Sequence, residues 1–155
     1  MKIAWEALAG RSGHAVGRAL LEALCLETVG EVPTVHTTAQ GKPYFANSTL
    51  HFSISHTKNH AFCCLSEHNI GIDAEEAGRD IDPRLAEKIL SDAEKARFHA
   101  AANKKAALLR LWVLKESYAK LTGRGWGSYL YHSDFSPEDP RIQIIDGCYV
   151  AVLEE

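Results

Sequence analysis

The stretch Gly71-Ile72-Asp73-Ala74-Glu75 decides how the rest of this chain is interpreted. It reads as a strand, and because residues two apart on a strand point to the same face, Asp73 and Glu75 share one face. Two such carboxylates repel each other unless a cation or a raised pKa relieves them. A solvated edge strand is the simpler explanation of the pair. The apolar flanking residues favour burial, where unpaired charges are costly, and so favour a metal ion.

A second segment, Trp112-Val113-Leu114-Lys115-Glu116-Ser117-Tyr118-Ala119-Lys120, reads as part of a long helix. Trp112, Glu116 and Lys120 then lie one turn apart on the same helix face. An ion pair between Glu116 and Lys120 on an exposed helix is the ordinary alternative. The apolar residues around them favour a face that lines a cleft. Three acids and a lysine brought together suit a hard divalent cation that holds the phosphates of a substrate.

The surrounding pattern predicts alternating strands and helices. Strands are expected over Met1–Ala7, Leu50–Ser55, Ala61–Leu65, Ile70–Glu75, Ser128–His132, Arg141–Ile145 and Tyr149–Leu153, and helices over His14–Glu27, Pro83–Leu90, Ser91–Ala101 and Lys104–Leu121. Gly30–Tyr44 reads as a loop, Leu50–Glu75 as an antiparallel meander, and Asp146-Gly147 as a hairpin turn. We therefore expect one α+β domain over residues 1–155. It would comprise two pseudo-symmetric halves, about 1–68 and 69–155, each an antiparallel sheet packed on a long helix.

Composition narrows the function classes. The 155 residues are 46% hydrophobic and 24% charged, which allows a real core and argues against disorder. A net charge of -3 without a basic tail makes duplex nucleic acid a poor first choice of partner. No apolar run is long enough for a membrane span and no signal segment opens the sequence, so cytoplasmic residence is expected. The four cysteines, Cys25, Cys63, Cys64 and Cys148, form no CxxC pair and are expected to be buried, reduced thiols.

Other polar residues carry weaker signals. Ser55 and His56 end a strand, where they would either form structural hydrogen bonds or contact a phosphate. A zinc cluster of His51, His56 and His60 is disfavoured, because strand spacing puts the first two on opposite faces and no cysteine or acid is expected to complete a tetrahedron. Gly41-Lys42-Pro43 is a turn that presents one lysine. Glu94 completes a capping box with Ser91.

The order of these motifs resembles one enzyme family. Gly41-Lys42-Pro43, Phe52-Ser53-Ile54-Ser55-His56, the acidic strand and Trp112-x-x-Lys115-Glu116-Ser117-x-x-Lys120 together resemble the 4′-phosphopantetheinyl transferases, most closely the surfactin-synthetase-activating type with two similar halves. The resemblance spans about Gly41 to Gly125. It implies Mg²⁺-dependent transfer of 4′-phosphopantetheine from coenzyme A, the substrate, to a serine of an acyl, peptidyl or aryl carrier protein, with release of adenosine 3′,5′-bisphosphate. A monomer is expected.

The resemblance also implies roles for particular residues. Asp73, Glu75 and Glu116 match the family's Mg²⁺ ligands, and Lys120 matches the lysine near the pyrophosphate. Ser55 and His56 match a pair at the coenzyme's phosphates, Lys42 matches a lysine near the nucleotide end, and Lys120 and His56 would offset charge on the leaving phosphate. Glu94 falls where the family has a glutamate that serves as a base, and the sequence leaves open whether it acts as base or helix cap.

One departure from the family concerns the coenzyme's 3′-phosphate. Larger members carry some tens of residues between the first strand and the first long helix, and that stretch supplies basic contacts to this phosphate. Here Ala9-Gly10-Arg11-Ser12-Gly13 joins the two directly, and Arg11, His14 or Arg18 are the candidate substitutes. Basic and aromatic candidates for carrier docking are Lys104, Lys105, Arg110, Arg124 and Trp126.

Two alternatives stand beside transfer. A metal-dependent phosphohydrolase acting on a small nucleotide would use the same acids with an activated water. A non-catalytic module that binds a carrier or the coenzyme would explain the short N-terminal half, although a pure binder gains little from three clustered carboxylates.

Overall fold

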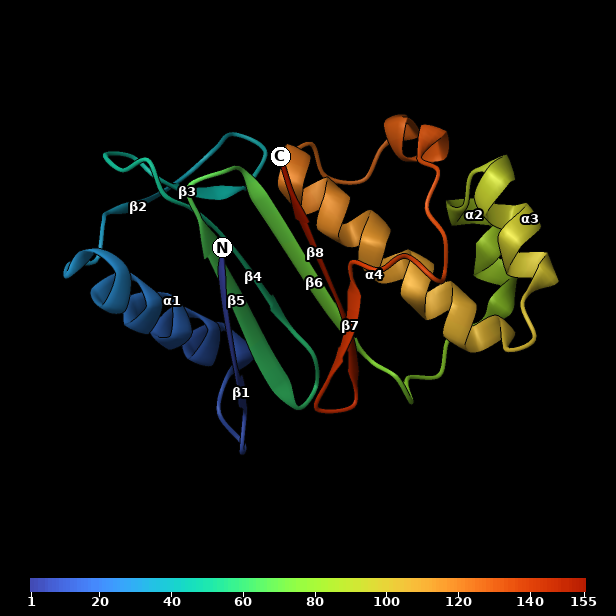
Figure 1. Ribbon diagram of the computed structural model, residues 1–155, viewed down its shortest axis with the longest axis horizontal. Helices are drawn as coiled ribbons and strands as arrows, with labels where there is room; N and C mark the ends of the chain where they lie inside the picture. The colour runs from blue at the N-terminus through green and yellow to red at the C-terminus, as the bar shows by residue number, and fades with distance from the viewer.

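A computed structural model describes all residues from Met1 to Glu155 (Figure 1). Its elements, in chain order, are β1 Lys2–Ala7, α1 Gly13–Val29, β2 Val35–Thr37, β3 Pro43–Phe45, β4 His51–His56, β5 His60–Ser66, β6 Ile70–Glu76, the 3₁₀ turn η1 Pro83–Leu85, α2 Ala86–Ile89, α3 Asp92–Ala100, α4 Lys104–Thr122, the 3₁₀ turn η2 Ser128–His132, β7 Ile142–Ile145 and β8 Cys148–Glu154. The predicted α+β class is confirmed.

Two three-stranded antiparallel sheets form the centre of the molecule. One has the strand order β1-β5-β4 and the other β6-β8-β7, so in each sheet the last strand of the half lies in the middle. Helix α1 covers the outer face of the first sheet and α4 that of the second, with the strands between the two helices (Figure 1). The two sheets thus have the same arrangement of strands, as expected for two similar halves. The change from one sheet to the other falls in the turn between β5 and β6.

The core follows these layers. Alternation along β5 sends Cys63 and Leu65 toward α1, and Phe62 and Cys64 toward the second sheet. On β6 the same alternation sends Ile72 inward to meet them. Asp73 and Glu75 therefore point the other way, toward α4. All four cysteines are free and buried, as predicted.

Local signals place most element boundaries. Helix α3 begins with the predicted capping box, in which Ser91 Oγ accepts from Glu94 N (3.2 Å) and Glu94 Oε2 accepts from Ser91 N (2.9 Å). Helix α4 ends at Gly123, whose φ of 66° is the left-handed conformation common at helix C-termini. Asp146 and Gly147 both have positive φ and form the predicted hairpin turn between β7 and β8.

Three sequence expectations are wrong. The meander over Leu50–Glu75 ends after β5, because β1 and β4 occupy both edges of β5, and β6 pairs with β8 instead. Ser128–His132 is a 3₁₀ turn and not a strand, since its backbone turns to bring the Leu130 carbonyl onto a buried lysine. Part of Gly30–Tyr44, expected as loop, forms the short β2–β3 ladder.

No helix of the structure combines the length and the apolar character needed to cross a lipid bilayer.

Candidate functional site

The predicted site residues come from β4, β6 and α4, and a glycine lets these elements approach closely. A Cβ added to Gly71 would lie 2.1 Å from the Ser117 carbonyl oxygen of α4. Ser117 Oγ donates to the Gly71 carbonyl at 2.7 Å, which fixes the crossing of helix and strand. On the other side, Ser55 Oγ of β4 accepts from Ala74 N of β6 at 3.3 Å. The close approach brings one face of α4 directly over the acidic face of β6.

A cleft opens where these elements meet, at the junction of the two halves. It has a volume of about 350 Å³, and its lining residues are Ile54, Ser55, His56, Asp73, Glu75, Arg79, Trp112, Glu116 and Lys120. Six residues predicted for the site therefore line one cavity. An adjoining cavity of about 290 Å³ shares Ile54, Glu116 and Lys120 with it and extends to Lys42 and Trp126.

Asp73 is the most buried acid of the cleft, with 6% of its surface exposed. It accepts hydrogen bonds from Lys120 Nζ (2.7 Å) and Ser55 Oγ (2.9 Å). Lys120 also donates to the carbonyls of Ile72 (3.0 Å) and Ile54 (3.4 Å), so this ammonium joins the two sheets. The ordinary alternative of a Glu116–Lys120 ion pair is not formed, because Asp73 projects from β6 directly toward the ammonium.

The other two acids of the cleft, Glu75 and Glu116, both have raised pKa values. Burial raises the pKa of Glu75, and the charge of Asp73 adds to the rise although Arg79 opposes it. Burial likewise raises the pKa of Glu116, with Asp73 again adding to the rise, against a hydrogen bond from Trp126 and the charge of Lys120. Like charges in partial burial favour the neutral acids unless a cation is present.

The donor set fits a hard divalent cation. Three carboxylates line one cavity, and oxygen donors of this kind are those that Mg²⁺ prefers. Each now takes a protein partner: Asp73 bonds to Lys120, Glu75 pairs with Arg79, and Glu116 accepts from Trp126 Nε1 at 2.5 Å. The three are not among the side chains whose ligand atoms all lie within 4.8 Å of one another. An ion bound by all three would draw the two glutamates away from their present partners.

Three predicted site residues lie apart from this acidic cluster. Lys42 lines the adjoining cavity, but its ammonium donates to the Leu121 carbonyl (2.6 Å) and to Asn69 Oδ1 (2.7 Å), and so caps the C-terminal end of α4. Arg11 lines neither cavity; its guanidinium pairs with Glu6 and donates to the carbonyls of Leu8 and Ala7, which fixes the turn before α1.

Glu94, the third, is fully buried and belongs to the interior. Its carboxylate pairs with Lys115 (2.6 Å) and accepts from the backbone amides of Ser91 and Phe135 and from Ser133 Oγ. It does not line the cleft. The contacts of Glu94 are those of a helix cap and of a counter-ion to Lys115.

Two cleft residues were missed by the sequence analysis as site residues. Arg79 pairs with Glu75 from four residues further on, and its guanidinium lies 5.9 Å from the centroid of Trp112. Trp126, considered only for docking, stacks on Trp112 with ring centroids 5.2 Å apart. The Glu75–Arg79 spacing was a visible signal for the first, whereas nothing local indicated that the chain after Gly125 returns to Glu116.

The fold and cleft together define a class: an α+β protein with two similar sheet-and-helix layers and a polar, acidic cleft at their junction. The chain belongs to the 4′-phosphopantetheinyl transferase superfamily, whose family model matches residues 69–146, half of the chain. It is 36% identical over 87 residues to 4′-phosphopantetheinyl transferase gsp of Aneurinibacillus migulanus, over 55% of this chain and 36% of that protein. It is 33% identical over 92 residues to 4′-phosphopantetheinyl transferase psf-1 of Bacillus pumilus, over 57% of this chain and 39% of that protein.

These matches confirm the family resemblance seen in the motifs. The aligned part spans less than half of the length of each of these relatives. The family model covers the acidic strand and helix α4, and leaves out the segment that carries Lys42, Ser55 and His56.

Proposed function

We propose that this chain transfers 4′-phosphopantetheine from coenzyme A to the hydroxyl of a carrier-protein serine and releases adenosine 3′,5′-bisphosphate. The observation that carries the proposal is the cleft of a chain in this superfamily, where Asp73, Glu75, Glu116 and Lys120 converge with Ser55 and His56. Phosphoryl transfer needs positioning and charge neutralisation more than covalent chemistry, and these side chains can provide both.

Asp73, Glu75 and Glu116 are the proposed magnesium ligands. Their carboxylate oxygens are ligands that a hard cation prefers. Such a cation would also relieve the mutual repulsion of these partly buried acids. When bound, Mg²⁺ would neutralise charge on the coenzyme's diphosphate. The stacked rings of Trp112 and Trp126 would help to orient the two glutamates. Trp126 lies beside Glu116, and Trp112 lies beside Glu75.

Lys120 and His56 are the proposed catalytic groups of the chain itself. Lys120 is held by carbonyls of both sheets, so its charge is fixed at the junction and would stabilise the departing bisphosphate. The serine oxygen would attack the pantetheine-side phosphorus, and the bond from this phosphorus to the bridging oxygen would break. The cleft offers His56 and solvent water as acceptors of the serine proton, because Glu94 lies outside it.

Lys42 and the β2–β3 turn would meet the nucleotide end, since they line the adjoining cavity. Arg11, His14 and Arg18 stay candidates for the 3′-phosphate, and Arg11 would have to leave Glu6 to reach that group.

Intact-mass spectrometry of apo carrier proteins tests the proposal. Acyl, peptidyl and aryl carriers are incubated with the chain, coenzyme A and Mg²⁺, and at least one should gain the mass of phosphopantetheine. The gain should vanish with EDTA, with the carrier serine changed to alanine, and with Glu116→Gln. Glu31→Gln is the matched control, because Glu31 is an exposed carboxylate outside the cleft.

The same assay separates the alternatives. Release of phosphopantetheine without a carrier would identify a phosphohydrolase. Binding of coenzyme or carrier in calorimetry, with no mass gain on any carrier, would identify a binding module. Full transfer by Glu116→Gln would refute the proposed metal site.

A further inference from the structure

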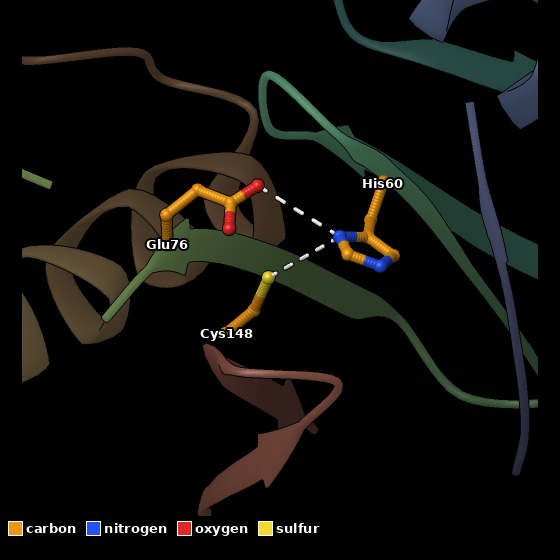
Figure 2. Close-up of side chains that lie close together, drawn as sticks. All are labelled: His60, Glu76 and Cys148. Atoms are coloured by element: carbon orange, nitrogen blue, oxygen red, sulfur yellow. Dashed lines mark hydrogen bonds and ion pairs between the residues drawn. The ribbon is translucent and has the colours of Figure 1, made fainter. Parts of the chain in front are cut away.

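A second group of ligand-type side chains lies on the opposite face of β6 from the cleft. His60 begins β5, Glu76 ends β6 and Cys148 begins β8, so the three come from both sheets (Figure 2). Their ligand atoms all lie within 4.8 Å of one another. Glu75 and Glu76 point to opposite faces of their strand, which separates this group from the acids of the cleft.

The spacing of the three atoms leaves room for an ion between them. His60 Nδ1 is 3.8 Å from Cys148 Sγ and 3.8 Å from Glu76 Oε1. With the third separation at or below 4.8 Å, a point equidistant from the three atoms in their plane lies about 2.0 to 2.5 Å from each. Zinc bonds to nitrogen, oxygen and thiolate are about 2.0 to 2.3 Å long. The triangle therefore matches a zinc ion with only small movements.

Hydrogen bonding accounts for only part of this spacing, since the contact between His60 Nδ1 and Cys148 Sγ is a long hydrogen bond of 3.8 Å. The 3.8 Å between His60 Nδ1 and Glu76 Oε1 is too long for a hydrogen bond, although both side chains point to the same place (Figure 2). Glu76 Oε1 is held from outside the triangle by Thr57 Oγ1 (2.6 Å) and Asn59 N (3.3 Å). Such outer contacts are those that orient metal-ligating carboxylates.

We propose that His60, Glu76 and Cys148 form a zinc-binding site that joins the two sheets at the ends of β5, β6 and β8. An imidazole, a carboxylate and a thiol form a mixed donor set, which suits Zn²⁺ better than Mg²⁺ or Ca²⁺, whose preferred ligands are all oxygens. His60, Glu76 and Cys148 line neither of the two cavities of the candidate active site.

Access to the site is compatible with this assignment. Cys148 is fully buried, whereas the side chains of His60 and Glu76 are 17% and 26% exposed, so an ion can enter from solvent and keep a water as its fourth ligand. Burial, and next the charge of Glu76, raise the pKa of Cys148 to about 11, so the metal-free group holds a thiol whose proton the ion displaces.

Titration with Zn²⁺ alone tests the site in the intact chain. The protein, reduced and in excess Mg²⁺ to occupy the cleft, competes for Zn²⁺ with a chromophoric chelator. One zinc per chain is expected, with affinity reduced at least tenfold in His60→Gln and in Cys148→Ser. Cys25→Ser is the matched control, because Cys25 is an equally buried thiol on α1, and this variant should bind zinc as the wild type does.

Co²⁺ gives an independent measurement that does not depend on a variant. Coordination by Cys148 should produce a thiolate-to-cobalt charge-transfer absorption in the wild type, and Zn²⁺ should remove it. The melting temperature should rise with Zn²⁺ in the wild type and in Glu116→Gln, and stay constant in His60→Gln. No stoichiometric zinc in the wild type, or equal zinc affinity in wild type and His60→Gln, would overturn the proposal. Loss of phosphopantetheine transfer would leave it intact.

Discussion

Helix α4 carries two lysines that form ion pairs of different kinds. Lys115 and Glu94 are both fully buried, and the ammonium donates to Glu94 Oε2, Leu130 O and Ser133 Oγ at 2.6 to 2.7 Å. The pair of Lys120 and Asp73 faces the cleft, and its lysine is 32% exposed. Both ammonium groups donate three hydrogen bonds inside the protein, but only the first pair is closed off from solvent. In the second, the carboxylate lies beside two further acids that favour a cation, so the same chemistry serves structure in one place and binding in the other.

Lys115→Met should give the largest loss of stability. It leaves the fully buried Glu94 without its counter-ion, and such changes cost about 3 to 5 kcal/mol of unfolding free energy. Chemical denaturation of the metal-free protein measures this. Lys95→Met on α3 is the control, since Lys95 makes only long contacts to Glu87 and Asp92. A loss below about 1 kcal/mol for Lys115→Met would show that the buried pair is not a structural support.

Lys120→Met should have the opposite pattern, with a large loss of transfer activity and a small loss of stability. Removing a positioned donor to transition-state charge costs about 10²- to 10³-fold in rate, so transfer should fall by at least that factor. The stability loss should be smaller than that of Lys115→Met, because solvent reaches Lys120 and Asp73 keeps its bond to Ser55. Both variants are assayed by carrier mass gain and by denaturation. Equal stability losses and equal activities would remove the distinction between the two pairs.

Much of this arrangement was visible in the sequence because its signals are local. The Ser91–Glu94 capping box, the glycine after α4 and the Asp146-Gly147 turn each lie within a few residues, and helical spacing alone put Glu116 and Lys120 on one face. Motif order then indicated the family and the metal-ligand set, which remains a prediction.

Long-range pairing was the part that the sequence could not provide. Nothing in Ile70–Glu76 says that both edges of β5 are already occupied, so the choice of β8 as partner was missed. The partner of Glu94 was missed for the same reason, since Lys115 reaches it only once α3 packs on α4. From the sequence, Cys148 was interpreted as an ordinary buried thiol, because nothing local shows that the pairing of β8 places it beside His60.

Gly71→Ala should damage the cleft through packing alone. The added Cβ would meet backbone atoms of Ser117 and Leu121, which move only if α4 shifts away from β6. Overpacking of this kind costs about 1 to 3 kcal/mol. Transfer activity should fall further than stability predicts, because Lys120 would lose its register with Asp73. Gly78→Ala is the control, since a Cβ there meets nothing within 4 Å. Unchanged stability and activity in Gly71→Ala would show that helix and strand do not need this contact.

Glu75→Gln should give the smallest change, a gain in stability without metal. The pKa of Glu75 is raised, so the folded protein holds this proton more tightly than the unfolded chain does. The contribution of Glu75 to stability is therefore fully present below the ordinary glutamate pKa and is lost as pH rises through the raised pKa. Gln has no such decline, and the loss of Glu75's pairing with the partly exposed Arg79 is minor. Without metal, the variant should match the wild type near pH 4 and exceed it at pH 7 by less than about 1 kcal/mol. Adding Mg²⁺ at pH 7 should reverse the order, because only the wild type keeps all three ligands. A variant that is less stable than the wild type at pH 7 without metal would show that Arg79 already balances this acid, and that the acids of the cleft do not repel one another.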